Sequence, residues 1–221
     1  MSKVKIRESV RRTEDIRFVS GRGTYIDDMN ANGQLVGVFV RSPYAHAVIN
    51  GFDKADALAL ESVVDVITGA DWAELGFGVI PTNSAVKENA DGTPIAVPER
   101  PCLAASRVRF VGEPVAMVIA ETLDAAREAR DLVEVDYVPL EAVTHPVKTL
   151  EPDAPQLHDD IDGNLCVHWE LGDGEATEAE LKACDHVVSL ELHNNRVTAA
   201  PIEPRGTLVV PDIETGITTI Y

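Results

Sequence analysis

The sequence lacks long hydrophobic runs, and no stretch approaches the roughly 20 apolar residues that a membrane-spanning helix needs. It also lacks paired cysteines, because Cys102, Cys166 and Cys184 are far apart and form no CxxC motif. This pattern argues against a disulfide framework and is typical of a reducing compartment. The basic N-terminus has no apolar segment of the signal-peptide type. The sequence therefore predicts a cytoplasmic protein without a membrane span.

Positive charge is scarce, with 19 Lys and Arg against 37 Asp and Glu and a net charge of −18. Nucleic-acid binding needs clustered basic residues, so no nucleic-acid partner is expected. The exception is the N-terminal arm, residues 1–17, and the few residues after it. Seven basic side chains lie in the first 22 residues: Lys3, Lys5, Arg7, Arg11, Arg12, Arg17 and Arg22. Two interpretations stay open: the arm docks on an acidic partner, or it is a loose terminus.

Residues 18–143 read as one α/β domain made of two similar halves. In the first half, residues 35–40 form an apolar run that predicts a strand buried on both faces. A short helix is expected over 53–62, followed by a strand over 63–68. The order strand, helix, strand predicts a βαβ unit.

The second half repeats this order. Apolar strands in the stretch 107–120 are interrupted at Gly112-Glu113-Pro114. Thr122 is a suitable cap for a helix that begins at Leu123, and a strand with alternating polarity follows over 133–140. The two halves are joined by a stretch rich in Gly, Pro, Asn and Asp that includes residues 79–101. Long irregular loops of this kind are often functional.

Beyond residue 143 the composition changes. Residues 144–164 are rich in Pro and Asp and predict a linker. The remaining 165–221 predict an incomplete mixed α/β unit whose last strand has no visible partner downstream. Its expected elements are a strand over 165–173, a helix over 176–185 with a Thr177–Glu180 capping box, an alternating stretch over 186–196, and a hairpin whose arms, 205–211 and 217–221, surround a turn at 212–216.

Motifs that carry chemistry are few. The stretch "GRGTY" has Ile26 where a nucleotide-binding loop would have its third glycine, so a backbone turn is the preferred interpretation. The stretch "HDDIDGN" lacks suitable first and last ligands for a calcium loop. The six histidines are scattered and form no HExxH motif or His/Cys cluster. No catalytic, cofactor-binding or metal-binding residue is predicted within the chain.

One rigid stretch, "NNRVTAAPIEPRG", places Glu203 between two prolines with Arg196 and Arg205 nearby. Prolines restrict the backbone, so a Glu–Arg pair here is either a structural clamp or part of a site wall. The clamp is the favoured interpretation.

The order of the motifs is more informative than any single one. The stretches "RTEDIRFVSGRGTYIDD", "GVFVRSPYAHAVI", "RVRFVGEPVAMVIAET", "EARDLVEVDYVPLEAV" and "NNRVTAAPIEPRG" follow one another along nearly the whole chain. This order resembles the molybdenum-binding large subunit of the xanthine dehydrogenase, aldehyde oxidase and carbon monoxide dehydrogenase family. The resemblance implies an a/b hammerhead domain over 18–143 and the truncated start of a molybdopterin-binding domain over 165–221.

The resemblance also implies an activity, oxidative hydroxylation of an aldehyde, N-heterocycle or similar small substrate, with water as the oxygen source. The complete enzyme would hold molybdopterin, with [2Fe–2S] clusters and FAD on partner subunits. The family's cofactor contacts lie later than this chain, and Gly76-Phe77-Gly78 is too early and too incomplete to serve as its GGxFG loop. The chain alone is therefore expected to bind no cofactor and to be inactive. The alternative is a non-catalytic, stand-alone hammerhead module for binding or assembly.

Overall fold

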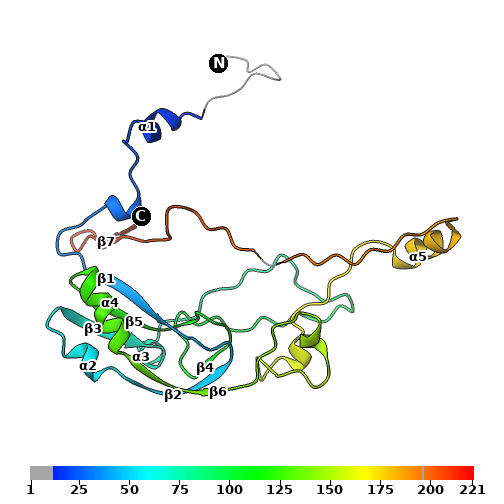
Figure 1. Cartoon of the computed structure of the whole chain (residues 1–221), viewed down its shortest axis with the longest axis horizontal. Helices are drawn as coiled ribbons and strands as arrows, with labels where there is room; N and C mark the ends of the chain where they lie inside the picture. Colours follow the sequence, from blue (N-terminus) through cyan, green and yellow to red (C-terminus); the bar gives the residue numbers. More distant parts are fainter. Residues whose placement is uncertain (1–11, 196) are drawn as a thin grey trace. The chain divides into compact units, whose positions relative to one another are not determined.

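The computed structural model describes residues 12–195 and 197–221, and Figure 1 traces the chain through its helices and strands. The chain divides into two compact units. One unit comprises Leu35–Val188. The other combines Met1–Gln34 with Ser189–Tyr221.

The first sheet of the larger unit has the strand order β1-β5-β3. Strand β5 (Pro114–Ala120) lies in the middle and runs antiparallel to both β1 (Val36–Arg41) and β3 (Val63–Thr68). Both edges of β5 are therefore hydrogen-bonded. Its apolar side chains supply much of the interior, and Val115 and Val118 are completely buried.

The second sheet has the order β4-β2-β6, again with antiparallel neighbours. Its central strand is β2 (Ala47–Asp53), flanked by β4 (Arg107–Val108) and β6 (Glu134–Pro139). Strand β2 was not predicted from the sequence. Its Asn50-Gly51 pair is a typical turn signal, but here it lies where the pairing with β6 becomes irregular.

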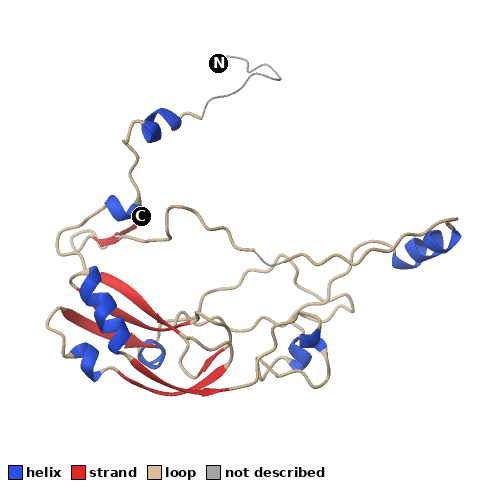
Figure 2. Cartoon of the chain, in the orientation of Figure 1, coloured by secondary structure: helices blue, strands red, loops and turns tan. Residues whose placement is uncertain are grey.

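Three helices lie beside the sheets, and Figure 2 shows them in blue next to the red strands. Helix α4 (Leu123–Leu132) packs on β1 and β5 and buries Ala126 and Ala129. The Thr122 hydroxyl accepts a hydrogen bond from the Ala125 amide, which confirms the predicted cap. Helix α2 (Ala55–Leu58) contacts α4, and α3 (Gly69–Glu74) follows β3 directly.

The core is rich in valine and alanine, and it contains buried side chains from both sheets. Its buried members are Val40, Ala47, Ile49, Ala57, Val66, Ala104, Val108, Val115, Ala116, Val118, Ala129 and Val133.

The mixed α/β class is confirmed, with two corrections to the expected halves. In the first half, β5 separates β1 from β3, because an antiparallel strand from the second half inserts between them. In the second half, β5 and β6 belong to different sheets, so this half is no βαβ unit. Strand β1 is also not buried on both faces: burial alternates along it and Phe39 is 42% exposed.

The stretch expected to be a linker contains two short 3₁₀ turns, η2 (Lys148–Leu150) and η3 (Asp162–Asn164). Residues 165–173 are extended but form no regular strand, because only a few backbone hydrogen bonds join them to a neighbouring loop. Helix α5 (Gly174–Ala183) begins two residues earlier than expected. Its cap is Asp173, which accepts from the Ala176 amide, so the predicted Thr177–Glu180 capping box is wrong.

The smaller unit contains α1 (Asp15–Val19), the 3₁₀ turn η1 (Ile26–Asp28) and a hairpin of β7 (Val209–Pro211) and β8 (Thr218–Ile220). The hairpin confirms the predicted arms and turn, with Val209 opposite Ile220.

The alternating stretch before the hairpin forms no strand in its described residues 186–195, all of which are exposed. Within residues 12–195 and 197–221, no helix is both long enough and apolar enough to cross a bilayer.

Candidate functional site: a buried polar cluster between the motifs

Two of the motifs noted in the sequence, "RSPYAHA" and "VGEPVA", are joined by hydrogen bonds in the larger unit. The Ser42 amide donates to the Glu113 carbonyl at 2.9 Å, and the Gly112 amide donates to the Ser42 carbonyl at 2.8 Å. The Arg41 guanidinium donates to the Gly112 carbonyl at 2.8 Å. Gly112 has φ of 85°, a value that glycine adopts readily, so the sharp turn depends on this residue.

Glu113 lies inside this junction with 7% of its surface exposed. Its Oε2 atom accepts a hydrogen bond from the Arg109 amide at 2.5 Å. Burial raises the pKa of Glu113, and the hydrogen bond and positive charge of Arg109 oppose that rise. The carboxyl group is thus an internal acceptor that closes the turn between β4 and β5.

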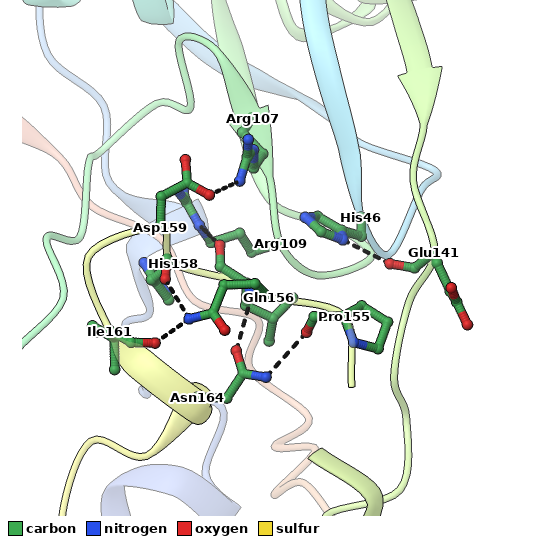
Figure 3. Close-up of polar contacts among 11 residues, drawn as sticks. His46, Arg107, Arg109, Glu141, Pro155, Gln156, His158, Asp159, Ile161 and Asn164 are labelled. Atoms are coloured by element: carbon green, nitrogen blue, oxygen red, sulfur yellow. Dashed lines mark hydrogen bonds and ion pairs between the residues drawn. The ribbon is translucent and has the colours of Figure 1, made fainter. Parts of the chain in front are cut away.

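His46 is the second buried member, with 4% exposure. Its Nδ1 atom lies 2.7 Å from the Glu141 carbonyl oxygen (Figure 3). A carbonyl can only accept, so we assign the ring proton to Nδ1. The Leu140 amide donates to the His46 carbonyl at 2.9 Å, so the chain leaving β6 is held at two points. The Nε2 atom is buried without a hydrogen-bond partner in the structure.

Tyr137 completes the cluster from β6. Its ring lies 5.2 Å from the Tyr44 ring, centroid to centroid, at an interplanar angle of 57°. Burial raises the pKa of the Tyr137 hydroxyl, and the nearby Ser42 hydroxyl opposes that rise. The Ser42 hydroxyl donates to the Tyr44 carbonyl and accepts from the Tyr44 amide, at 3.0 Å each. The Tyr137 hydroxyl oxygen is buried without a hydrogen-bond partner among the described residues.

The cluster's chemistry is that of a positioning element. Its polar groups fasten three motif segments together in the interior, and none forms a nucleophile–base pair. Among the described residues, no group of three or more His, Cys, Asp and Glu side chains could hold a metal ion. His46, Glu113 and Tyr137 carry no distinctive signal in the sequence, because only the burial of their polar atoms sets them apart.

The long loop is largely exposed along residues 79–101. A hydrogen bond from the Ile80 amide to the Arg100 carbonyl, at 2.8 Å, closes its base. The Gly76-Phe77-Gly78 stretch forms the turn that ends α3: Gly76 has φ of 73°, and the Trp72 indole donates to the Gly78 carbonyl at 3.3 Å. The glycines of this stretch are therefore explained by the turn that ends α3.

The predicted clamp residues have different outcomes. Glu203 accepts a hydrogen bond from the Ile26 amide at 3.4 Å, which links "APIEPRG" to the turn after "GRGTY". Arg205 is exposed, and these two described side chains form no ion pair with each other. Arg196 lies outside the described residues. The clamp therefore stays a prediction, now with a backbone partner for Glu203.

The motif order and two family matches define the chain as part of a molybdenum-hydroxylase type of protein. Residues 20–141 match the family model described as "aldehyde oxidase and xanthine dehydrogenase, a/b hammerhead domain". Residues 157–221 match the model described as "molybdopterin cofactor-binding domain". The first match spans more than half of the chain, and the chain belongs to the aldehyde oxidase and xanthine dehydrogenase family.

Relatives with known names agree with this assignment. The chain is 38% identical to the carbon monoxide dehydrogenase large chain of Afipia carboxidovorans, over 87% of this chain and 24% of that one. It is 39% identical to the nicotine 6-hydroxylase large subunit of Paenarthrobacter nicotinovorans, over 92% of this chain and 24% of the relative. Among solved structures, quinoline 2-oxidoreductase from Pseudomonas putida 86 aligns with a TM-score of 0.80 and 35% identity, over 96% of this chain and 26% of that one. The chain spans about a quarter of the length of these relatives.

The residues present do not by themselves fit a pterin cofactor. In the described part of 157–221, Ile161 is the single fully buried residue, and α5 buries none of its side chains. A cofactor site needs a concave, largely enclosed surface. The described residues of 157–221 provide no enclosed surface of this kind.

Proposed function

We propose that this chain is the N-terminal portion of the large subunit of a cytoplasmic molybdenum hydroxylase. The complete enzyme would hydroxylate a small substrate such as an aldehyde or N-heterocycle, with water as the oxygen source. When bound, the molybdopterin cofactor would supply the redox chemistry. The observation that carries this proposal is the order of the two family matches, the hammerhead domain first and the cofactor-binding domain second.

The chain's own contribution would be scaffold. The cluster of Ser42, His46, Glu113 and Tyr137 fixes the motif segments relative to one another inside the larger unit. The exposed loop at 79–101 would form part of the substrate funnel, because ligand sites favour domain interfaces. Its exposure supports this role, since few of its side chains are used by the hammerhead core.

The proposed partners are the remainder of the molybdenum subunit, an iron–sulfur subunit and an FAD subunit. The names of the relatives support an assembly: they include large chains, large subunits and a dehydrogenase complex subunit. The basic N-terminal arm would contact one of the redox subunits, although most of it, residues 1–11, lies outside the described residues.

Purification from the native cell tests the proposal. The protein carrying this sequence should contain molybdenum, should co-purify with iron and flavin, and should reduce an electron-accepting dye when a suitable substrate is added. Preparations free of molybdenum and without partner chains would contradict the proposal. That result would favour the alternative, a stand-alone hammerhead module.

Deletion of residues 83–94 tests the funnel role. In the assembled enzyme we expect a changed ratio of kcat/KM values between substrates of different size. The matched control replaces two exposed α4 residues, Asp124 and Arg127, with alanine and should leave the ratio unchanged. An unchanged ratio in the deletion variant, with normal molybdenum content, would remove the loop from the funnel.

A further inference from the structure

Two arginines, Arg107 in β4 and Arg109 directly after it, flank the buried Val108. Val108 is completely buried and pairs with Ala47. Successive side chains of a strand point to opposite faces, so Arg107 lies on the side away from Val108, and Arg109, just after the strand, is likewise only partly buried. Two guanidinium groups are therefore available beside β4 to bind a neighbouring segment.

A segment from the predicted linker, residues 155–164, lies on these arginines; we call it the strap. The Arg107 Nη1 atom lies 2.8 Å from Asp159 Oδ1, and the Arg109 Nε atom donates to the Leu157 carbonyl at 2.9 Å. Figure 3 shows the contact between Arg107 and Asp159, with Arg109 beside it. Ile161, with 4% exposure, adds an apolar anchor.

The strap is also folded on itself around Asn164. The side-chain Nδ2 atom of Asn164 donates to the carbonyls of Pro155 and Thr149. Its Oδ1 atom accepts from the backbone amide of Leu157 at 2.9 Å. The residue has φ of 58°, a conformation that asparagine tolerates better than most side chains. One side chain thus closes a loop that would otherwise be an open linker.

The strap contains the first residues of the second family match. The hammerhead match ends at residue 141, and the cofactor-binding match begins at residue 157, inside the strap. The strap is therefore where the chain enters the second matched region while still bonded to the first.

We propose that the strap is a separately opening latch that fixes the start of the second matched region on the hammerhead sheet, with Arg109 as its main positioning residue. The strap has two polar bonds to Arg107 and Arg109 and one buried apolar side chain, Ile161, whereas β5 is paired on both edges and has several buried side chains. Segments with few buried apolar contacts open locally at lower free energy than the core. The latch should therefore open while the sheets stay folded.

Hydrogen exchange read by mass spectrometry on the full 221-residue chain tests this inference without any need for activity. Arg109→Gln should speed exchange of the strap amides, such as Leu157 and Ile161, by about tenfold, because a charge-assisted hydrogen bond is lost. Exchange of the β5 amides should stay unchanged. Asn164→Ala should give an effect of the same kind, and Arg127→Gln, on the exposed side of α4, is the matched control.

Two results would overturn the proposal. Unchanged strap exchange in Arg109→Gln would show that this arginine does not hold the latch. Equal acceleration in the strap and β5 would show that the two open as one unit. Arg109→Lys, which keeps the charge but not the guanidinium geometry, separates a general loss of folding from loss of the latch: it should accelerate the strap alone. Neither outcome depends on whether the molybdenum-hydroxylase assignment is correct.

Discussion

Strand β5 and residues 186–195 both carry closely spaced apolar side chains, yet only those of β5 are buried. Val115, Ala116, Val118 and Ala120 have no exposed surface, whereas Val188, Leu190 and Leu192 are 92%, 77% and 79% exposed. The difference lies in their neighbours: β5 is hydrogen-bonded on both edges, and no strand pairs with the described residues 186–195. An apolar pattern becomes a strand when another segment satisfies its backbone and covers its face.

The largest loss of stability is expected from a substitution at Gly69, the first residue of α3, which is buried in the larger unit. A Cβ atom there would lie 2.3 Å from the Ala104 carbonyl oxygen, a backbone atom that cannot rotate away. We expect Gly69→Ala to lower the free energy of unfolding by about 3 kcal/mol. The control is Gly78→Ala, where the added Cβ would meet nothing within 4 Å. Similar urea midpoints for the two variants would contradict the close packing at Gly69.

A matched pair of valines tests the comparison directly. Val118→Ala removes two buried methyl groups and should lower the free energy of unfolding by about 2 kcal/mol. Val188→Ala changes a side chain that is 92% exposed and should alter it by less than about 0.5 kcal/mol. Urea unfolding followed by far-UV circular dichroism checks both. If Val188→Ala were as destabilising as Val118→Ala, residues 186–195 would have to be packed.

The buried carboxyl group of Glu113 allows the effect of burial to be tested on a polar side chain. Glu113→Ala leaves the Arg109 amide without its acceptor and should cost about 1–2 kcal/mol. Glu113→Gln keeps an acceptor oxygen and should cost less. Since burial raises the pKa of Glu113, the folded state holds its proton more tightly, and wild-type stability should fall as the pH rises above about 4.5. That slope should be absent in Glu113→Gln, and a persisting slope would assign it to another group.

Two helix caps of the same type test how context changes one hydrogen bond. Thr122 caps α4, which buries Ala126 and Ala129, and Asp173 caps α5, which buries nothing. Thr122→Ala should lower the free energy of global unfolding by about 1 kcal/mol. Asp173→Ala should only increase fraying of α5, seen as faster amide exchange there. An equal global effect of both would show that α5 unfolds together with the sheets.

The smallest expected effect is a pH dependence at His158 in the strap. Burial lowers its pKa, followed by the positive charge of Arg109 and, more weakly, of Arg107, while Asp160 and Asp159 oppose this. The docked strap therefore binds fewer protons than the open one, and docking should weaken as the pH falls below about 6.5. We expect strap exchange, corrected for intrinsic rates, to rise between pH 7.5 and 5. His158→Gln should show no such rise; an identical rise would remove His158 as its cause.

Local signals predicted much of the fold. The Thr122 cap and the strand at 63–68 are confirmed, and so is the terminal hairpin with its turn at Asp212, because adjacent residues decide each of these. Strand β2 was missed, since Asn50-Gly51 reads locally as a turn and its pairing partners are 59 or more residues away in the chain. The helix cap at Asp173 was also missed, because Thr177 fits the capping pattern equally well.

The candidate site was harder to predict than the fold. The sequence singled out Arg196, Glu203 and Arg205 for their proline-rich context, and Glu203 alone has a described hydrogen bond that bears on the clamp. His46 and Glu113 were overlooked because a lone histidine or glutamate in an acidic chain carries no signal until its burial is known.

By itself, the sequence determined the local elements and, through the order of its motifs, the family to which the chain belongs. These properties depend on residues close together along the chain. The tertiary structure decided which apolar stretches are covered, how β5 separates β1 from β3, and that Arg107 and Arg109 hold the strap. Such features require residues 48 to 84 positions apart to meet, and no local pattern encodes that meeting.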